Sequence, residues 1–342
     1  MITVLGYDII GSEKKEGIRY AWGDDRFRNH VESAAFIRRT KLGGEDICAY
    51  TTSVSSGCIL KAQHCPCQFC RTGKVLPFNG LLTYKEIAKQ NIFMVLSDMH
   101  CSDHPSLVNK QREFAYMGQG EPGFSYPQVR LAIELTNRVM KDLDQTVYRH
   151  IFSTCGIPEA IASFKSDIMS GYFSEKVTLH FSLHALSLRN RLMPINNIYP
   201  CKEVIEQLSS VFDVTKEKIC VGILLFWKFK TRNSDFEYST TLDNLLPILD
   251  LLDPNKFRLS LCEYNAFDDI GIAGFYPQDE ADKLMESAVN RGFEAKFFSS
   301  YGQKEMSACG LLGGKEPDHS ASVKWKELDQ FAEELINKHI NF

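Results

Sequence analysis

The chain has 342 residues, of which 44% are hydrophobic and 24% charged, and 39 basic against 43 acidic residues give a formal charge of -4. This composition is typical of a folded globular protein and excludes a strongly cationic chain, so any nucleic-acid binding must come from a local basic surface. No apolar run is long enough to span a membrane and the first residues lack the pattern of a signal peptide, so we expect a cytoplasmic protein with no membrane partner.

From residue 82 onward, segments with helical periodicity alternate with short strand-like runs. Helices are predicted where apolar residues recur every three or four positions, and strands where short runs rich in β-branched or aromatic residues lie between them. The predicted helices are 82–97, 127–143, 158–164, 201–212, 242–252 and 278–290. The predicted strands are 112–118, 147–153, 177–184, 219–226, 257–264 and 295–298.

This alternation predicts an α/β fold. Strands separated by helices pair in parallel through right-handed crossovers, which favours an α/β barrel, full or partial, with its site at the C-terminal ends of the strands. We expect a short β-rich extension over residues 1–47, a barrel over 48–315, and a closing helix within 316–342. The apolar residues of that helix are Trp325, Leu328, Phe331 and Leu335.

Four of the eleven cysteines lie in the first strand-to-helix loop, at Cys58, Cys65, Cys67 and Cys70. Disulfides are rare in the cytoplasm, so such a cluster indicates metal or redox chemistry, and the two-residue gap before Cys70 lets two sulfurs face one centre. Three thiolates can hold a [4Fe-4S] cluster with one iron left open. Structural zinc and no metal at all are the alternatives, although a four-cysteine zinc site normally needs a second CxxC pair, which the sequence lacks.

Five motifs in order resemble those of the RlmN/Cfr family of radical S-adenosylmethionine (SAM) methyltransferases, which modify adenine in ribosomal RNA. The resemblance extends from about residue 31 to 314, and no single motif would be specific alone. The motifs are the cysteine motif ending CQFCRTG, YMGQGEP (116–122), STCGIP (153–158), SLHALSLRNRLMPIN (182–196) and SSYGQKEMSACG (299–310). The resemblance implies a radical SAM partial (β/α)6 barrel that carries a [4Fe-4S] cluster.

The same resemblance implies a set of cofactor ligands. The cluster would be held by Cys58, Cys67 and Cys70, in an expanded C-x8-C-x2-C loop, with Cys65 as a competing ligand for Cys58. Glycines after a strand let a ligand approach the backbone, and a carboxylate there can bind the ammonium of SAM. The residues expected to bind SAM are Gly120, Glu121, Ser153, Ser182, Leu183, His184 and Asn265. A tight turn with a solvated acid at Glu121, and a merely packed histidine at His184, are the alternatives.

Two further cysteines would carry the chemistry. By resemblance, Cys309 takes a methyl group from one SAM, and a 5′-deoxyadenosyl radical made from a second SAM removes hydrogen from that S-methylcysteine. The resulting radical adds to an sp2 carbon of the substrate. Cys48 would resolve the adduct by forming a disulfide with Cys309. Glu32 aligns with a family acid proposed as a proton acceptor, and a solvated Glu at a strand edge is the alternative.

Several departures from the family concern the substrate more than SAM. By the resemblance, we expect this protein to lack the family's N-terminal RNA-binding domain. Tyr301 stands where the family has Arg, and the interval between Cys48 and Cys58 is longer than usual. The basic segments 38–41, 189–191 and 228–232 could bind RNA or be ordinary solvated faces.

We therefore expect a radical SAM methyltransferase acting on an RNA adenine, supplied with electrons by a flavodoxin or ferredoxin. One alternative is the same chemistry on a free nucleotide or small heterocycle. Another is an iron-sulfur redox or binding protein that does not methylate.

Overall fold

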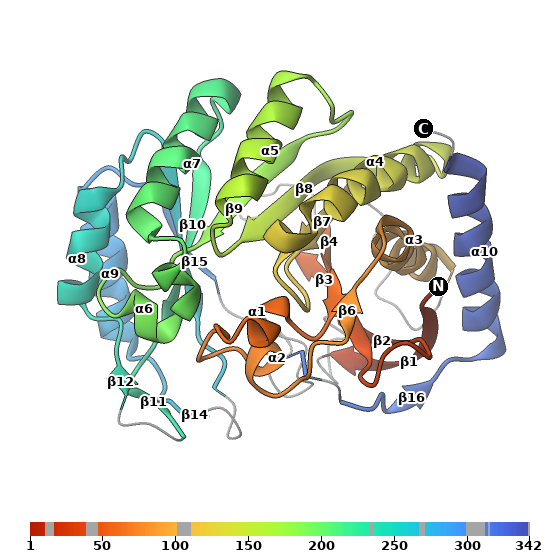
Figure 1. The fold of residues 1–342 in the computed structure, drawn as a ribbon, viewed down its shortest axis with the longest axis horizontal. Helices are drawn as coiled ribbons and strands as arrows, with labels where there is room; N and C mark the ends of the chain where they lie inside the picture. The colour runs from red at the N-terminus through yellow and green to blue at the C-terminus, as the bar shows by residue number, and fades with distance from the viewer. Residues whose placement is uncertain are drawn as a thin grey trace.

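The computed structural model describes residues 1–10, 17–38, 47–100, 111–232, 236–266, 271–298, 312–313 and 315–340. Its core is one sheet with strands in the order β15-β13-β10-β9-β8-β7-β4-β3-β2-β1-β16 (Figure 1). From β4 to β15 in this order every neighbouring pair is parallel. These strands are β4 (Ile47–Thr52), β7 (Gln111–Tyr116), β8 (Thr146–Thr154), β9 (Val177–Ser182), β10 (Ile219–Leu225), β13 (Phe257–Glu263) and β15 (Ala295–Phe298).

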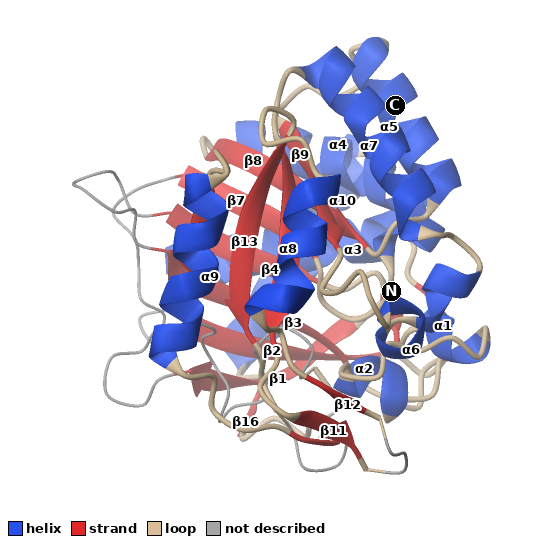
Figure 2. Ribbon diagram, turned by 90° about the vertical axis from the view of Figure 1, so that its left-hand side faces the viewer, coloured by secondary structure: helices blue, strands red, loops and turns tan. Residues whose placement is uncertain are grey.

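One long helix connects each parallel strand to the next, and these helices follow one another around the outer side of the sheet (Figures 1 and 2). They are α3 (Tyr84–His100), α4 (Tyr126–Asp142), α5 (Pro158–Met169), α7 (Cys201–Thr215), α8 (Leu242–Leu251) and α9 (Gln278–Asn290). The predicted alternation is confirmed, with six strand-helix units and β15 as a further parallel strand. Helix α5 is longer than expected because Asp167, beyond the predicted end, accepts hydrogen bonds from Tyr126 and Arg130 on α4.

The N-terminal extension continues the same sheet. Strands β1 (Thr3–Ile10), β2 (Gly17–Gly23) and β3 (Val31–Arg38) pair antiparallel in sequence, and β3 pairs antiparallel with β4. A short strand near the C-terminus, β16 (His319–Ser320), pairs with β1. The N-terminal strands and the parallel strands thus belong to one sheet. The division of the chain at residues 47 and 315 stays a prediction.

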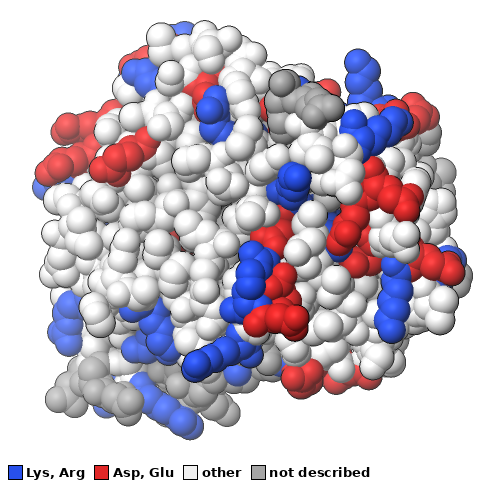
Figure 3. All heavy atoms as spheres, turned by 45° about the vertical axis from the view of Figure 1, so that its right-hand side comes forward, with Lys and Arg blue, Asp and Glu red and all other residues white. Residues whose placement is uncertain are grey.

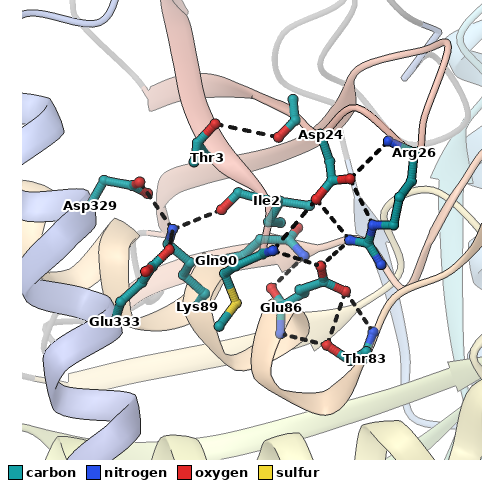
Figure 4. A network of polar contacts seen from close by, with 12 residues as sticks. Ile2, Thr3, Asp24, Arg26, Thr83, Glu86, Lys89, Gln90, Asp329 and Glu333 are labelled. Carbon is teal, nitrogen blue, oxygen red and sulfur yellow. Dashed lines mark hydrogen bonds and ion pairs between the residues drawn. The ribbon is translucent and has the colours of Figure 1, made fainter.

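The closing helix, α10 (Val323–His339), lies beside α3 and the N-terminal strands (Figure 1). Its attachment includes Lys89 of α3, whose buried ammonium donates to the carbonyl of Ile2 (2.7 Å), to Asp329 (3.0 Å) and to Glu333 (2.6 Å) (Figure 4). A buried ammonium needs acceptors of this kind. Lys89 therefore connects α10 to α3 and to the N-terminal residue Ile2. Of the four apolar residues named for this helix, Trp325, Leu328 and Leu335 are buried, whereas Phe331 is 40% exposed.

The loops at the C-terminal ends of the parallel strands carry short elements that the periodicity did not predict. They lie together in the lower part of Figure 1. They include α1 (Ile59–Ala62), α2 (Arg71–Lys74), α6 (Arg189–Leu192) and a small sheet of β11 (Phe229–Thr231), β12 (Glu237–Tyr238) and β14 (Gly271–Ile272). Among the described residues, no helix has the length and apolar character needed to cross a membrane.

Candidate active site

The cysteine loop follows β4 and is packed over the C-terminal end of the sheet. Gln68 donates its backbone N–H to Leu192 O of α6 (2.8 Å), which joins this loop to the one after β9. The ring of Phe69 meets His184 edge-on at 5.0 Å and lies 5.4 Å from the ring of Phe226 and 6.5 Å from that of Tyr264. Phe69, between the two CxxC cysteines, therefore seats the loop on residues that follow three neighbouring strands.

The charges of Cys70 and Cys58 act on Cys67, and the charge of Cys70 acts on Cys58. Burial raises the pKa of Cys67 well above its usual range, and the charges of Cys70 and Cys58 raise it further. Burial also raises the pKa of Cys58, again with Cys70 as the next cause. For Cys65, burial is the cause of a raised pKa, and Cys65 adds only weakly to the shift at Cys58. The choice between Cys58 and Cys65 as the third cluster ligand stays a prediction.

Cys58 is buried, and Cys67 and Cys70 are half-buried. Three such thiols in one loop fit a centre that holds them as thiolates and balances their charge. Within the described ranges, no group of three or more His, Cys, Asp or Glu residues is placed so that it could hold a metal ion. In a [4Fe-4S] cluster each cysteine binds a different iron, so the three thiols need not meet at one point as the ligands of a single metal ion do. The donor set therefore fits a [4Fe-4S] cluster, which remains a proposal.

The loop after β7 is bonded to the start of the cysteine loop. Gln119 receives the backbone N–H of Val54 on its carbonyl (2.9 Å) and donates its own N–H to Ser53 Oγ (2.7 Å). Gly120 has φ +101, and a Cβ there would lie 2.1 Å from Ser55 Oγ. Only glycine fits this left-handed, closely packed position, which explains the second glycine of the MGQGEP motif.

Glu121 is buried, and the alternative of a solvated acid is wrong. Its Oε1 accepts from Gly123 N (2.8 Å) and from the Thr154 hydroxyl, and its Oε2 accepts from Cys155 N (2.9 Å). Burial raises the pKa of Glu121, whereas these hydrogen bonds lower it, because they stabilise the charged form. The carboxylate is thus fixed between the loops that follow β7 and β8.

The SLH segment leaves β9 at its C-terminal end. Leu183 is fully buried, and its backbone N–H donates to Gly222 O (3.1 Å). His184 has φ +60, and its Nδ1 accepts the backbone N–H of Leu224 (3.2 Å), so Nε2 carries the proton of the neutral ring. Burial, with a contribution from Arg189, lowers the pKa of His184 to about 3. His184 is therefore a neutral, backbone-held histidine.

The remaining expected SAM ligands lie at the same edge of the sheet. Ser153 is half-buried near the end of β8, Ser182 is half-buried at the end of β9, and Asn265 is 4% exposed just after β13. All seven expected SAM ligands thus lie near the C-terminal ends of β7, β8, β9 and β13. Their contacts with SAM remain proposals.

Arg189 was grouped with Arg191 as a basic surface segment, and this interpretation is wrong for Arg189. Its side chain is buried, and its Nη2 donates to Cys155 O (3.0 Å) and Ser182 O (3.0 Å). Burial lowers the pKa of Arg189, and the charges of Cys155, Cys201, Cys67 and Glu121 raise it. A fixed cation therefore lies inside the candidate site.

Glu32 on β3 is also fully buried, so the alternative of a solvated strand-edge residue is wrong. It forms an ion pair with Arg19 on β2 and accepts from Gln119 Nε2 (3.0 Å). The hydroxyl of Ser53 donates to its backbone carbonyl. Glu32 thus contacts the loops that carry Glu121 and the cysteines, and its role as a proton acceptor remains a proposal.

The structure does not bring Cys48 to this site. Cys48 is the second residue of β4, about 13 Å along the strand from Thr52, where the cysteine loop begins. Its side chain faces α3, where its thiol donates to Asp98 Oδ2 (2.8 Å). Cys48 is a free thiol, so the disulfide with Cys309 implied by the resemblance is not found, and Cys309 lies outside the described residues.

Three residues of the site were missed from the sequence. Cys155 lies within the STCGIP motif but was not expected to be a site residue, yet its backbone holds both Glu121 and Arg189. Gln119 connects three segments, but a polar residue between two glycines is also typical of an ordinary turn, so it gave no specific signal. Arg189 had no signal of its own, because the carbonyls that it binds belong to the end of β9 and to the loop after β8.

Comparisons with known proteins agree with this geometry. No protein-family model matches the chain. The chain is 28% identical over 280 residues to the probable dual-specificity RNA methyltransferase RlmN of Petrotoga mobilis, covering 80% of this chain and 72% of that protein. It is 25% identical over 337 residues to the dual-specificity RNA methyltransferase RlmN of Pseudomonas entomophila, covering 90% and 83%.

Among solved structures, the chain matches a radical SAM methyltransferase from Sphaerobacter thermophilus with a TM-score of 0.70. The match covers 92% of this chain and 82% of that chain at 21% identity, so it shows the fold. The resemblance stated from the motifs is confirmed: the chain is a homologue of the RlmN methyltransferases and an enzyme built on the radical SAM methyltransferase fold.

Proposed function

We propose that this enzyme methylates an sp2 carbon of an RNA adenine, with SAM as the methyl donor and as the source of a radical. The observation that carries the proposal is that the loop with Cys58, Cys67 and Cys70, which follows β4, and the fixed carboxylate of Glu121, which follows β7, lie at the same C-terminal edge of the parallel strands. The names of the sequence relatives support methylation of RNA. A cytoplasmic location suits the free cysteines, since that compartment keeps thiols reduced.

Cys58, Cys67 and Cys70 would hold a [4Fe-4S] cluster, reduced by a flavodoxin or ferredoxin. When bound, the cluster supplies the electron that cleaves SAM to a 5′-deoxyadenosyl radical. Phe69 and α6 hold the cysteine loop against the residues that follow β9, through the contact of the Phe69 ring with His184 and the hydrogen bond from Gln68 N to Leu192 O.

SAM would lie across the strand ends. Glu121 would bind its ammonium, and the backbone of Gly120 would contact it. Glu121 Oε2 accepts the backbone N–H of Cys155, and a carboxylate oxygen can accept more than one donor, so it keeps capacity for a ligand. Ser153, Ser182, Leu183, His184 and Asn265 would complete this site from β8, β9 and β13.

Cys309 would accept the methyl group as a thiolate and present it to the radical, and Glu32 would accept a proton. Cys48 is the second thiol of the implied mechanism. Its described position on the helix-facing side of β4 gives that role no support, and the test below includes it.

The charges at the loop end of the molecule suit a phosphate backbone. The exposed or half-buried residues Lys61, Lys74, Arg191 and Lys230 all lie on elements at this end (Figure 1). Figure 3 shows Lys and Arg side chains gathered at the lower left of the face it draws, with Asp and Glu side chains on the lower right. Clustered cations of this kind provide sequence-independent affinity for RNA in a chain whose net charge is negative.

Anaerobic reconstitution with methyl-labelled SAM, a ribosomal-RNA transcript and adenosine monophosphate tests the proposal. We expect label on the Cys309 peptide and in adenine from the digested RNA. Cys309→Ala should lose both, and the matched control Cys220→Ala, a buried cysteine on β10, should keep both.

Each alternative predicts a different result. Label in adenosine monophosphate alone would make the substrate a free nucleotide. Production of 5′-deoxyadenosine with no label on Cys309 would contradict the methyl-carrier mechanism. Cys48→Ala should trap a protein-substrate adduct if Cys48 resolves it, and unchanged turnover would remove Cys48 from the mechanism.

A further inference from the structure

Arg189 is a buried cation with unmet hydrogen-bonding capacity. It is 1% exposed, and Nη2 alone carries its hydrogen bonds to Cys155 O and Ser182 O. Its Nε and Nη1 are buried without a hydrogen-bond partner among the described residues. Each carries N–H donors, and a buried charged donor left unsatisfied is strongly destabilising.

No described carboxylate forms an ion pair with Arg189, whereas the buried Arg19, Arg112 and Arg149 each have one. A guanidinium does not lose its proton under ordinary conditions, so neutralisation is no remedy. A cation buried in this way normally has an anionic partner. The partner expected here is therefore a ligand.

A second charge lies beside it. Cys155 donates its N–H to Glu121 Oε2 and accepts from Arg189 Nη2, so one residue holds a carboxylate on one side and a guanidinium on the other. The two charges interact but form no ion pair within the described residues. A free α-amino acid group carries the complementary pair, an ammonium and a carboxylate on a single carbon.

We propose that Arg189 binds the carboxylate of the methionine part of SAM while Glu121 binds its ammonium, so that the Cys155 backbone sets the spacing of the two. This inference rests on the proposed function, because it requires SAM to bind at this edge. Arg189, which the sequence had placed in a basic surface segment, would then be an anion-binding residue of the site.

Binding of SAM and of decarboxylated SAM, which lacks only the carboxylate, tests the proposal in reconstituted protein. The readouts are the dissociation constants and the change that each ligand causes in the electron paramagnetic resonance of the reduced cluster. We expect the wild type to prefer SAM by about 10- to 100-fold, the range for a hydrogen bond to a charged group. In Arg189→Gln the preference for SAM should fall by about tenfold or more, and Arg189→Lys should restore part of it.

Arg112→Gln is the matched control, since Arg112 is also a buried arginine but lies at the other end of the strands. It should lower stability and keep the preference for SAM. An unchanged preference in Arg189→Gln overturns the proposal. So does a more negative cluster potential in that variant with the preference intact, because Arg189 would then balance the charge of the cluster. A wild type that binds neither ligand would instead contradict the proposed function.

Discussion

Two buried polar clusters lie at opposite ends of the parallel strands, and they differ in how their charges are satisfied. The Asp98 cluster consists of Cys48, Tyr50, Asp98 and Arg112, near the starts of β4 and β7. Asp98 Oδ2 accepts from Cys48 (2.8 Å), Tyr50 (2.6 Å) and Arg112 (2.7 Å), so the anion and the cation compensate each other.

The Arg189 cluster consists of Cys67, Glu121, Cys155 and Arg189, near the strand ends. The guanidinium of Arg189 donates hydrogen bonds to carbonyl oxygens and lies 5.4 Å from the ring of Phe181, and two of its nitrogens have no hydrogen-bond partner in the described part of the chain. Pairing within the protein is typical of a structural role, whereas an uncompensated buried charge indicates a place for a ligand. The difference separates the scaffold from the site.

The largest expected effect at the site is the loss of iron when a cluster cysteine is replaced. Cys67→Ala, Cys70→Ala and Cys58→Ala should each lose the cluster after anaerobic reconstitution, because a cluster held by three thiolates cannot lose one without falling apart. Cys65→Ala should retain it, and iron and sulfide analysis with absorption spectra measures both. If Cys65→Ala loses iron while Cys58→Ala keeps it, Cys65 is the ligand.

Stability gives the largest effect at the Asp98 cluster. Asp98→Ala removes the acceptor shared by Cys48, Tyr50 and Arg112 and leaves a buried cation without its anion. We expect a loss of about 3–5 kcal/mol in the free energy of unfolding, measured by denaturant titration. Binding of SAM by the folded fraction should be unchanged. A large loss of SAM affinity with normal stability would mean that the two clusters are coupled.

A buried neutral group, His150, is expected to make the stability of the protein depend on pH. His150 is fully buried between Asn137 Oδ1 (2.7 Å from Nε2) and Tyr116 OH (3.1 Å from Nδ1), and burial lowers its pKa to about 3. The unfolded chain binds a proton at His150 below about pH 6.5, whereas the folded chain does not. Stability should therefore fall as the pH drops from about 6.5 towards 3, by up to about 1.4 kcal/mol per unit.

His150→Gln should flatten this dependence, as measured by unfolding at a series of pH values. His64→Gln, at an exposed loop position, is the control and should keep the wild-type slope. An identical slope in both variants would show that other groups set the acid sensitivity.

Much of this arrangement could be predicted from the sequence, because it depends on local periodicity. The alternation of helices and strands follows from apolar spacing, and the motif residues Gly120 and Glu121 follow from their place after a strand. The small sheet of β11, β12 and β14 was missed because its strands have two or three residues and pair across long intervals.

The clusters themselves could not be predicted, because they depend on tertiary contacts. A strand alternates its faces at every residue, so the face that Cys48 occupies depends on register, which spacing to Cys58 does not give. The burial of Arg189 depends on carbonyls from β9 and from the loop after β8, whereas its neighbours Asn190 and Arg191 are exposed. A run of charged residues in the sequence does not show which of them turns inward.

The smallest effect concerns the thiol of Cys48. Burial, followed by the charge of Asp98, raises the pKa of Cys48 above the range in which a thiolate forms, and a thiol must be a thiolate to attack a disulfide or an alkylating agent. In the native protein at pH 8, iodoacetamide should leave Cys48 unmodified, and modification should follow unfolding. Cys48→Ser should change the free energy of unfolding by about 1 kcal/mol or less, since the hydroxyl can donate to Asp98 in place of the weaker thiol. Rapid native labelling, measured by peptide mass spectrometry, would mean that Cys48 leaves Asp98 on the timescale of turnover. The Asp98 cluster would then open during catalysis, and the contrast between a closed scaffold end and an open site end would no longer hold.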